Sequence, residues 1–197
     1  MSETPAAETR SKVLRSRTTA AHATLDNRIM ASRPFESRER YGLFLQVQHA
    51  FYGDIDALYA DPALDRLLPD LAGRRRLGKI EDDLADLGLA AAPADGAAAF
   101  SADVEAPKAL GWLYVAEGSN LGAAILLKEA MKLGLSETFG ARHLAGAPEG
   151  RGLHWRTFTA ALDGVALDAA GEAAVVDGAN TAFLRVRSLV ERFMPKA

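Results

Sequence analysis

Few residues in this chain could bind a metal or a cofactor. The sequence has no cysteine, which excludes disulfides, thiolate metal sites, haem attachment through a C-x-x-C-H motif and cysteine nucleophiles. A metal or a cofactor iron would therefore have to be held by His, Met, Tyr, Asp or Glu. The histidines available for this are His22, His49, His143 and His154.

His22 has a basic residue near it at helical spacing. Apolar and small residues recur at steps of three and four over 8–31, which predicts a helix, and Arg15 precedes His22 by seven residues. The two side chains would lie about 10 Å apart along one helix. A haem needs an axial imidazole and cations for its propionates, and this helix could supply both. A lone helical histidine is more often a core or surface residue, and that alternative stays open here.

The apolar segment 110–134 is predicted to be a long helix, although it contains Gly111, Gly118 and Gly122. Each interior glycine costs a helix about 1 kcal/mol relative to alanine. At steps of three and four, these glycines share one face with Tyr114 and Ile125. Either a second helix approaches this face closely, or a large flat ligand lies against its bare backbone. Spacing alone does not decide between the two.

Helical patterns cover most of the remaining chain. We expect helices over about 37–59 with Ser37 as the N-cap, from Asp61-Pro62, over about 75–87 before Gly88, a short one within 135–152, and two over 153–165 and 168–193. Residues 90–105 lack periodicity and are predicted to be a surface connection. The sequence predicts an all-α, single-domain protein of about seven or eight helices, with a disordered N-terminus at 1–8 and the domain at 9–197.

The composition is that of an ordinary soluble globule. The 197 residues are 49% hydrophobic and 25% charged, enough for one core. The N-terminal MSETPAAETR lacks the features of a secretory signal, and we find no stretch of roughly 20 apolar residues. We therefore expect a cytoplasmic protein that binds neither membrane nor nucleic acid.

Charge is unevenly distributed along the chain. The net charge is −3, but the segment 10–40 holds eight Lys and Arg residues against three acidic ones. This segment could face an anionic ligand or an acidic partner protein. The alternative is a solvated helix face with no partner.

Three blocks of the sequence together resemble the biliverdin-forming haem oxygenases of bacteria, in particular those that degrade imported haem for iron. The blocks are RSRTTAAHATLDN (15–27), LGWLYVAEGSNLGAAILLKEA (110–130) and GARHLAGAPEGRGLHW (140–155). They occur in the same order with similar spacing, and the likeness extends over about 10–193. The resemblance implies a haem-oxygenase helical bundle with haem b between the first, proximal helix and a glycine-containing distal helix. It also implies conversion of haem to biliverdin, CO and ferrous iron, with O2 and with electrons from a ferredoxin or an NAD(P)H-dependent reductase.

The resemblance assigns roles to individual residues on both sides of the haem. His22 matches the proximal iron ligand in the context T-x-A-x-H-x-x-x-D-N. Gly118 and Gly122 match the distal glycines, and Ser119 lies between them. A distal face of backbone and ordered water would leave room for oxygen to bend toward the porphyrin edge and would avoid peroxidase chemistry.

Further matches concern the propionates and the distal water. Arg15 and Tyr114 match residues that hold a propionate, and Gln48 and Arg76 match positions that help to order a distal water network. Tyr52 stands where one type of relative has a histidine in that network, so the route of proton delivery is not implied.

The position of ring cleavage depends on the propionate anchors. Relatives that cleave at the δ or β carbon have an asparagine at the position of Arg15 and a lysine on the distal helix, where this chain has Glu129. We therefore predict the α isomer of biliverdin.

Two other readings stay open beside the enzyme. A non-catalytic haem carrier or storage protein would need the same His22 and the same apolar slot. An all-helical enzyme of the thiaminase type shares the general fold but normally uses a cysteine, which this chain lacks. His49, His143 and His154 are interpreted as structural.

Overall fold

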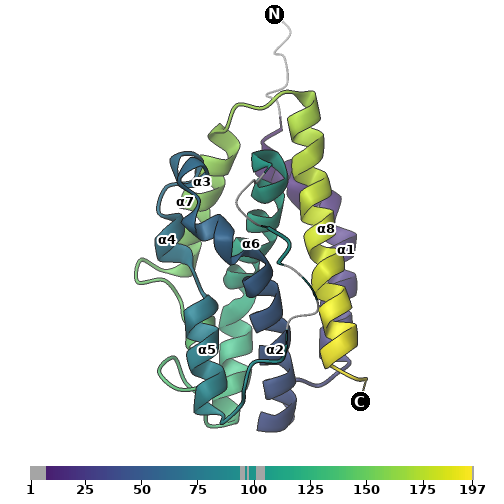
Figure 1. Ribbon diagram of the computed structural model, residues 1–197, viewed down its shortest axis with the longest axis vertical. Coiled ribbons are helices and arrows are strands. Elements are labelled where there is room, and N and C mark those ends of the chain that lie inside the picture. Colours follow the sequence, from purple (N-terminus) through teal and green to yellow (C-terminus); the bar gives the residue numbers. More distant parts are fainter. Residues whose placement is uncertain (1–7, 94–95, 97, 101–104, 197) are drawn as a thin grey trace, which may run out of the picture.

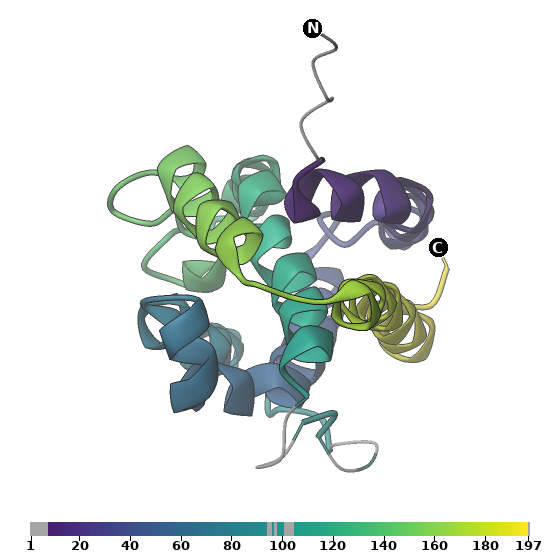
Figure 2. The same ribbon diagram turned by 90° about the horizontal axis from the view of Figure 1, so that it is seen from above.

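Helix α6 (Ala106–Lys132) runs through the middle of the computed structural model, and the other long helices surround it (Figure 2). The structure describes residues 8–93, 96, 98–100 and 105–196. The predicted disordered segment 1–8 lies outside these residues except for Glu8. The other elements are α1 (Arg10–Met30), α2 (Arg38–Ile55), η1 (Asp56–Ala60), α3 (Pro62–Leu67), α4 (Leu71–Arg74), α5 (Leu77–Asp86), η2 (Arg142–Leu144), α7 (Arg151–Gly164) and α8 (Ala169–Phe193).

The long helices are arranged as an elongated bundle. In Figure 1, α8 and α1 lie side by side along one flank, α5 lies toward the other, and α2 lies between α5 and α8. Helices α1 and α6 both pack against α7 and α8, with the most extensive packing between α6 and α8. The predicted all-α fold is confirmed, and no strand occurs among the described residues.

Several predicted helix starts are confirmed by their caps. The Ser37 side chain accepts a hydrogen bond from the N–H of Arg40, and Asp61 accepts from the N–H groups of Ala63 and Leu64. These bonds satisfy amide groups that have no partner inside the helix. Gly88 follows α5 with a φ of +68°, a left-handed conformation that glycine adopts without strain.

Gly111 permits the close crossing of α6 and α8. A Cβ atom there would lie 2.1 Å from the carbonyl oxygen of Val175 and 2.5 Å from the amide nitrogen of Ala179. Gly178 on α8 is required for the same reason, because a Cβ there would lie 2.3 Å from the carbonyl oxygen of Lys108. The two backbones touch at this point, so helix packing explains Gly111.

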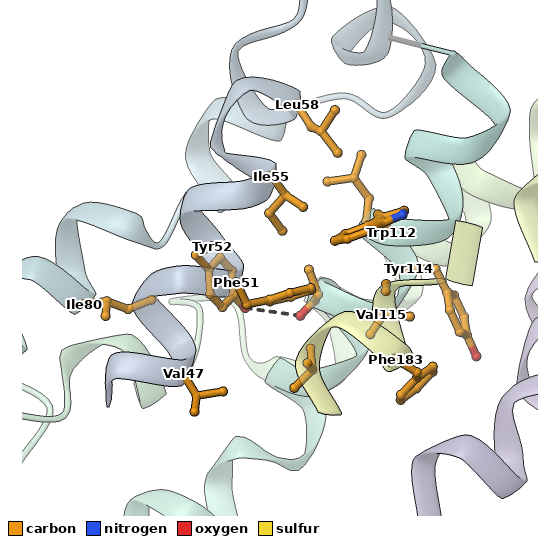
Figure 3. Packing of buried hydrophobic residues seen from close by; sticks show 14 of the residues in the cluster. Val47, Phe51, Tyr52, Ile55, Leu58, Ile80, Trp112, Tyr114, Val115 and Phe183 are labelled. Carbon is orange, nitrogen blue, oxygen red and sulfur yellow. Dashed lines mark hydrogen bonds between the residues drawn. The ribbon is translucent and has the colours of Figure 1, made fainter. Parts of the chain in front are cut away.

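The core lies where α2, α6 and α8 meet. Phe51 of α2 stacks on Trp112 of α6 with ring centroids 5.9 Å apart, and Phe100 meets the same indole edge-on at 5.3 Å. Figure 3 shows Phe51 and Trp112 within this cluster, with Tyr114 and Phe183 at its edge beside α1. Burial of such large side chains stabilises the fold by roughly 2–3 kcal/mol each.

Some local predictions were wrong. Phe100 is 8% exposed, so 90–105 is not entirely a surface connection. Helix α4 was missed because four residues are too few to show a period, and 135–152 forms only the 3-10 turn η2. By length and hydropathy α6 could span a membrane, contrary to the sequence-based expectation, but 50% of its apolar window is buried inside the fold, as in the core helix of a globular protein.

Candidate active site

His22 lies on the exposed face of α1 with its ring held by a neighbour. Its Nδ1 is 2.9 Å from Oδ2 of Asp26 one turn later, and the imidazole side chain is 60% exposed. Because a carboxylate only accepts hydrogen bonds, Nδ1 carries the hydrogen and Nε2 is left to bind a metal. Phe183 of α8 contacts the ring edge-on at 6.0 Å between centroids. A carboxylate-oriented, accessible imidazole is a suitable axial ligand for a haem iron.

The second half of α6 presents a bare and partly apolar face. No described residue lies within 4 Å of a Cβ built at Gly122, and a Cβ at Gly118 would make only ordinary contact with Trp155 at 3.5 Å. Leu121 and Ile125 beside them are 45% and 70% exposed. Unlike Gly111, these two glycines are not required by a neighbouring helix. A flat apolar ligand would cover such a face, so the residues present fit a haem.

Arg15 of α1 lies near enough to Tyr114 of α6 for its charge to act on the phenol. Burial raises the pKa of the Tyr114 phenol, and the nearby charge of Arg15 and the hydroxyl of Thr18 partly counteract this. The phenol is therefore a neutral donor at neutral pH. A guanidinium and a phenol from facing helices form a suitable anchor for a carboxylate.

The predicted distal residues lie behind and beside α6. The Tyr52 hydroxyl is 3.4 Å from the carbonyl oxygen of Ala116, to which it donates, and 3.5 Å from Oγ of Ser119. Burial raises the pKa of Tyr52, so it keeps its proton. Gln48 lies half-buried one turn before Tyr52 on α2, hence on the same helix face.

Arg76 is buried behind α6 and only partly paired. Its Nη1 donates to the carbonyl oxygens of His143 and Ala145, but its Nε has no partner among the described residues. Nδ2 of Asn120 likewise has no partner among the described residues, and the residue is 7% exposed. Both residues line a cavity of about 10 Å³ of water-accessible volume, which has room for about one water.

A buried ion pair adjoins this cavity. Nη1 of Arg74 is 3.0 Å from Oε2 of Glu117, and the two side chains are 4% and 1% exposed. The Tyr59 hydroxyl donates to the other carboxylate oxygen at 3.1 Å. These contacts anchor the first half of α6 to the short helix α4 and to η1.

A second buried pair holds the turn η2. Nδ1 of His143 lies 2.8 Å from Oδ2 of Asp83, which also accepts from the backbone N–H of His143. Burial alone would raise the pKa of Asp83, but the hydrogen bonds from His143 and from the N–H of Arg142 outweigh it and lower the pKa. Burial lowers the pKa of His143. The structural interpretation of His143 fits this geometry.

The sequence reasoning missed several of these groups. Asp26 could have been found from its i, i+4 spacing to His22. Asn120 and Trp155 lie within quoted motifs but carry no periodic signal of their own. The basic segment 10–40 is also less available to a partner than its charge count suggests, because five of its cations already bind groups of this chain: Arg10, Arg28, Arg33, Arg38 and Arg40.

Comparison with known proteins decides the family. The family model for Heme oxygenase matches residues 8–192. The chain belongs to the haem oxygenase family. It is 43% identical to the Heme oxygenase PigA of Pseudomonas aeruginosa over 183 residues, which cover 93% of this chain and 92% of that protein. It also superimposes on the NO- and CO-bound haem oxygenase of Neisseria meningitidis with a TM-score of 0.91 and 40% identity, over 97% of this chain and 94% of the other.

Membership in this family establishes the general activity. This haem oxygenase is an enzyme that degrades haem to biliverdin, using O2 and reducing equivalents. The family resemblance predicted from the three sequence blocks is confirmed. The family also favours the enzyme over the carrier and thiaminase-type alternatives.

Proposed function

We propose that this haem oxygenase binds haem b through His22 on one side and the Gly118–Gly122 face of α6 on the other, and cleaves it at the α meso carbon. The main support is the contrast between the glycines of α6. Gly111 is filled by α8, while Gly122 faces open space. A ligand that lies against this face would explain why the second half of α6 has glycine at these two positions.

In this proposal the bound haem supplies the iron that activates O2 and the meso carbon that is oxidised. The protein binds the iron through Nε2 of His22 and fixes the ring rotation through Arg15 and Tyr114. Ser119, Gln48 and Arg76 hold distal water and shield the site, and the bare backbone at Gly118 and Gly122 offers no acid that would break the O–O bond prematurely.

The α isomer follows from the charges at the haem edge. Arg15 is on the proximal helix near Tyr114, whereas the alternative distal anchor position holds Glu129, an acid already paired with Lys132 at 2.7 Å. A carboxylate at this position would repel a propionate. Electrons would come from a ferredoxin or an NAD(P)H-dependent reductase in the cytoplasm, and the released iron would serve iron acquisition.

The test is the His22→Ala variant, with His49→Ala as the matched control. His22→Ala should lose the Soret band of imidazole-bound haem and form no biliverdin, while His49→Ala should behave as wild type. An unchanged Soret spectrum together with biliverdin production by His22→Ala, without added imidazole, would show that another residue is the proximal ligand.

A further inference from the structure

Three titratable side chains lead from solvent to the back of the distal helix. Glu149, in the loop before α7, is 43% exposed, and its Oε1 is 2.7 Å from Nδ1 of His154. His154 is 12% exposed, and its Nε2 is 3.6 Å from Oε2 of the buried Glu117. The imidazole thus stands between an outer carboxylate and an inner one.

The inner end of this series opens on the small cavity behind α6. His154 and Glu117 line the cavity together with Arg76 and Asn120. Two donors of these lining residues, Nε of Arg76 and Nδ2 of Asn120, are buried without a partner among the described residues. A buried water that accepts from such donors is the usual way to satisfy them.

The cavity adjoins hydroxyl groups that reach the exposed face of α6. The Tyr52 hydroxyl is 3.5 Å from Oγ of Ser119, and Ser119 precedes Asn120 of the cavity lining on α6. Ser119 is exposed on the part of α6 that carries the two distal glycines. Polar groups therefore continue from solvent to the proposed haem side.

We propose that His154 is the proton entry point of the enzyme, passing protons from Glu149 through the cavity water to Tyr52 and Ser119. This rests on the proposed function, because the protons are those that oxygen activation consumes at the haem. In the tautomer that carries its hydrogen on Nε2, Nδ1 takes a proton from Glu149 while Nε2 releases its own to the water, and a hydronium ion of the solvent reprotonates Glu149. Two O–H bonds and one N–H bond break, two O–H bonds and one N–H bond form, and no electron moves. Rotation of the ring then exchanges the positions of its nitrogens, so that the next proton can follow in the same direction.

The charges around His154 suit this role. Glu149 and Glu117 face its two ring nitrogens. Arg74 of α4 donates to its backbone carbonyl at 3.2 Å and pairs with Glu117. Arg76 and Arg151 line the same cavity. Carboxylates and guanidiniums thus surround one imidazole.

The test compares His154→Gln with His49→Gln as the matched control. His49 is also half-buried, and its Nε2 is 3.8 Å from Oε1 of Glu81, but it does not line the cavity. Glutamine keeps a donor toward Glu149 but cannot relay a proton. With O2 and an electron donor, His154→Gln should form biliverdin about tenfold more slowly, with a larger solvent deuterium effect and without the wild-type dependence on pH. With hydrogen peroxide, which brings its own proton and electrons, the rate should equal that of wild type. Glu149→Gln should show the same pattern more weakly.

Three outcomes would overturn the relay. His154→Gln could keep the wild-type rate, isotope effect and pH profile with O2. It could lose the O2 and peroxide reactions equally, which would indicate a packing role. His49→Gln could show the same loss, which would make the effect unspecific. Failure of the proposed function is recognised separately, because His22→Ala would then keep the wild-type Soret spectrum and still form biliverdin.

Discussion

Substituting alanine for single glycines of α6 should separate packing from ligand binding within one helix. Alanine at position 111 would place a Cβ 2.1 Å and 2.5 Å from backbone atoms of α8, closer than the 3.0 Å that real Cβ atoms keep. Alanine at position 122 would meet nothing within 4 Å. The two variants carry the same chemical change, so their difference reports only the surroundings.

The magnitudes follow from these distances. At position 111 the helices must separate by roughly 1 Å at their most extensive contact, and overpacking costs about 1–3 kcal/mol or more. Backbone atoms cannot move aside as the tips of side chains can, so we expect a cost at the upper end of this range. Alanine also gains about 1 kcal/mol in helix propensity over glycine, so the free energy of unfolding should fall by roughly 2 kcal/mol net. That corresponds to a fall in Tm of about 4–8 °C. At position 122 the propensity gain of about 1 kcal/mol should remain, raising Tm by about 2–4 °C.

The assays are calorimetric unfolding of the haem-free protein and haem titration followed by turnover. Gly122→Ala should unfold at or above the wild-type temperature yet bind or convert haem less well. Gly111→Ala should be destabilised before haem is added. A Gly122→Ala protein as unstable as Gly111→Ala, or one that is stable with unaltered haem binding and turnover, would refute the assignment of this face to a ligand.

Three other predictions concern charged groups. Arg15→Asn should shift the biliverdin product from the α isomer toward δ and β, as read by chromatography, and an unchanged α product would exclude Arg15 as the anchor. A group whose folded pKa is depressed contributes stability above its unfolded pKa, so the haem-free protein should lose the contribution of His143 as pH falls below about 6.5 and that of Asp83 as pH falls below about 4. In Asp83→Asn, denaturant titration should show about 2 kcal/mol less stability at neutral pH and a weaker pH dependence below about pH 4, and wild-type stability at neutral pH would contradict this. Glu117→Gln should cost about 3–5 kcal/mol because it leaves Arg74 buried without its counter-charge, and the double variant with Arg74→Met should recover much of that loss, whereas additive losses would mean that the pair is not coupled.

Periodicity was sufficient for the features that depend on one helix at a time. It placed His22 with Arg15 and grouped the glycines of α6, and caps such as Ser37 fixed where helices begin. It could not tell that Gly111 is covered and Gly122 is not, because that difference depends on where α8 crosses. The resemblance to haem oxygenases already favoured ligand contact over helix packing at Gly118 and Gly122.

Contacts between distant segments could not be derived from spacing. Arg74 and Glu117 are separated by 43 residues, and Asp83 and His143 by 60. Nothing local marks either pair, since a helical glutamate or a loop histidine usually faces solvent. The cavity near Asn120 is likewise a product of three-dimensional packing. These groups became visible only once the helices were placed.

The close crossing at Gly111 and Gly178 makes the two halves of α6 differ in how deeply they are buried. Its residues from Ala109 to Glu117 are all buried, whereas most of those after Glu117 are not. The first half of the helix is therefore enclosed by the core, while the second half keeps an exposed face toward the proposed haem side. Low local burial lowers the free energy of local opening. We therefore expect the second half, rather than the first, to adjust when a rigid planar substrate enters and its open-chain product leaves.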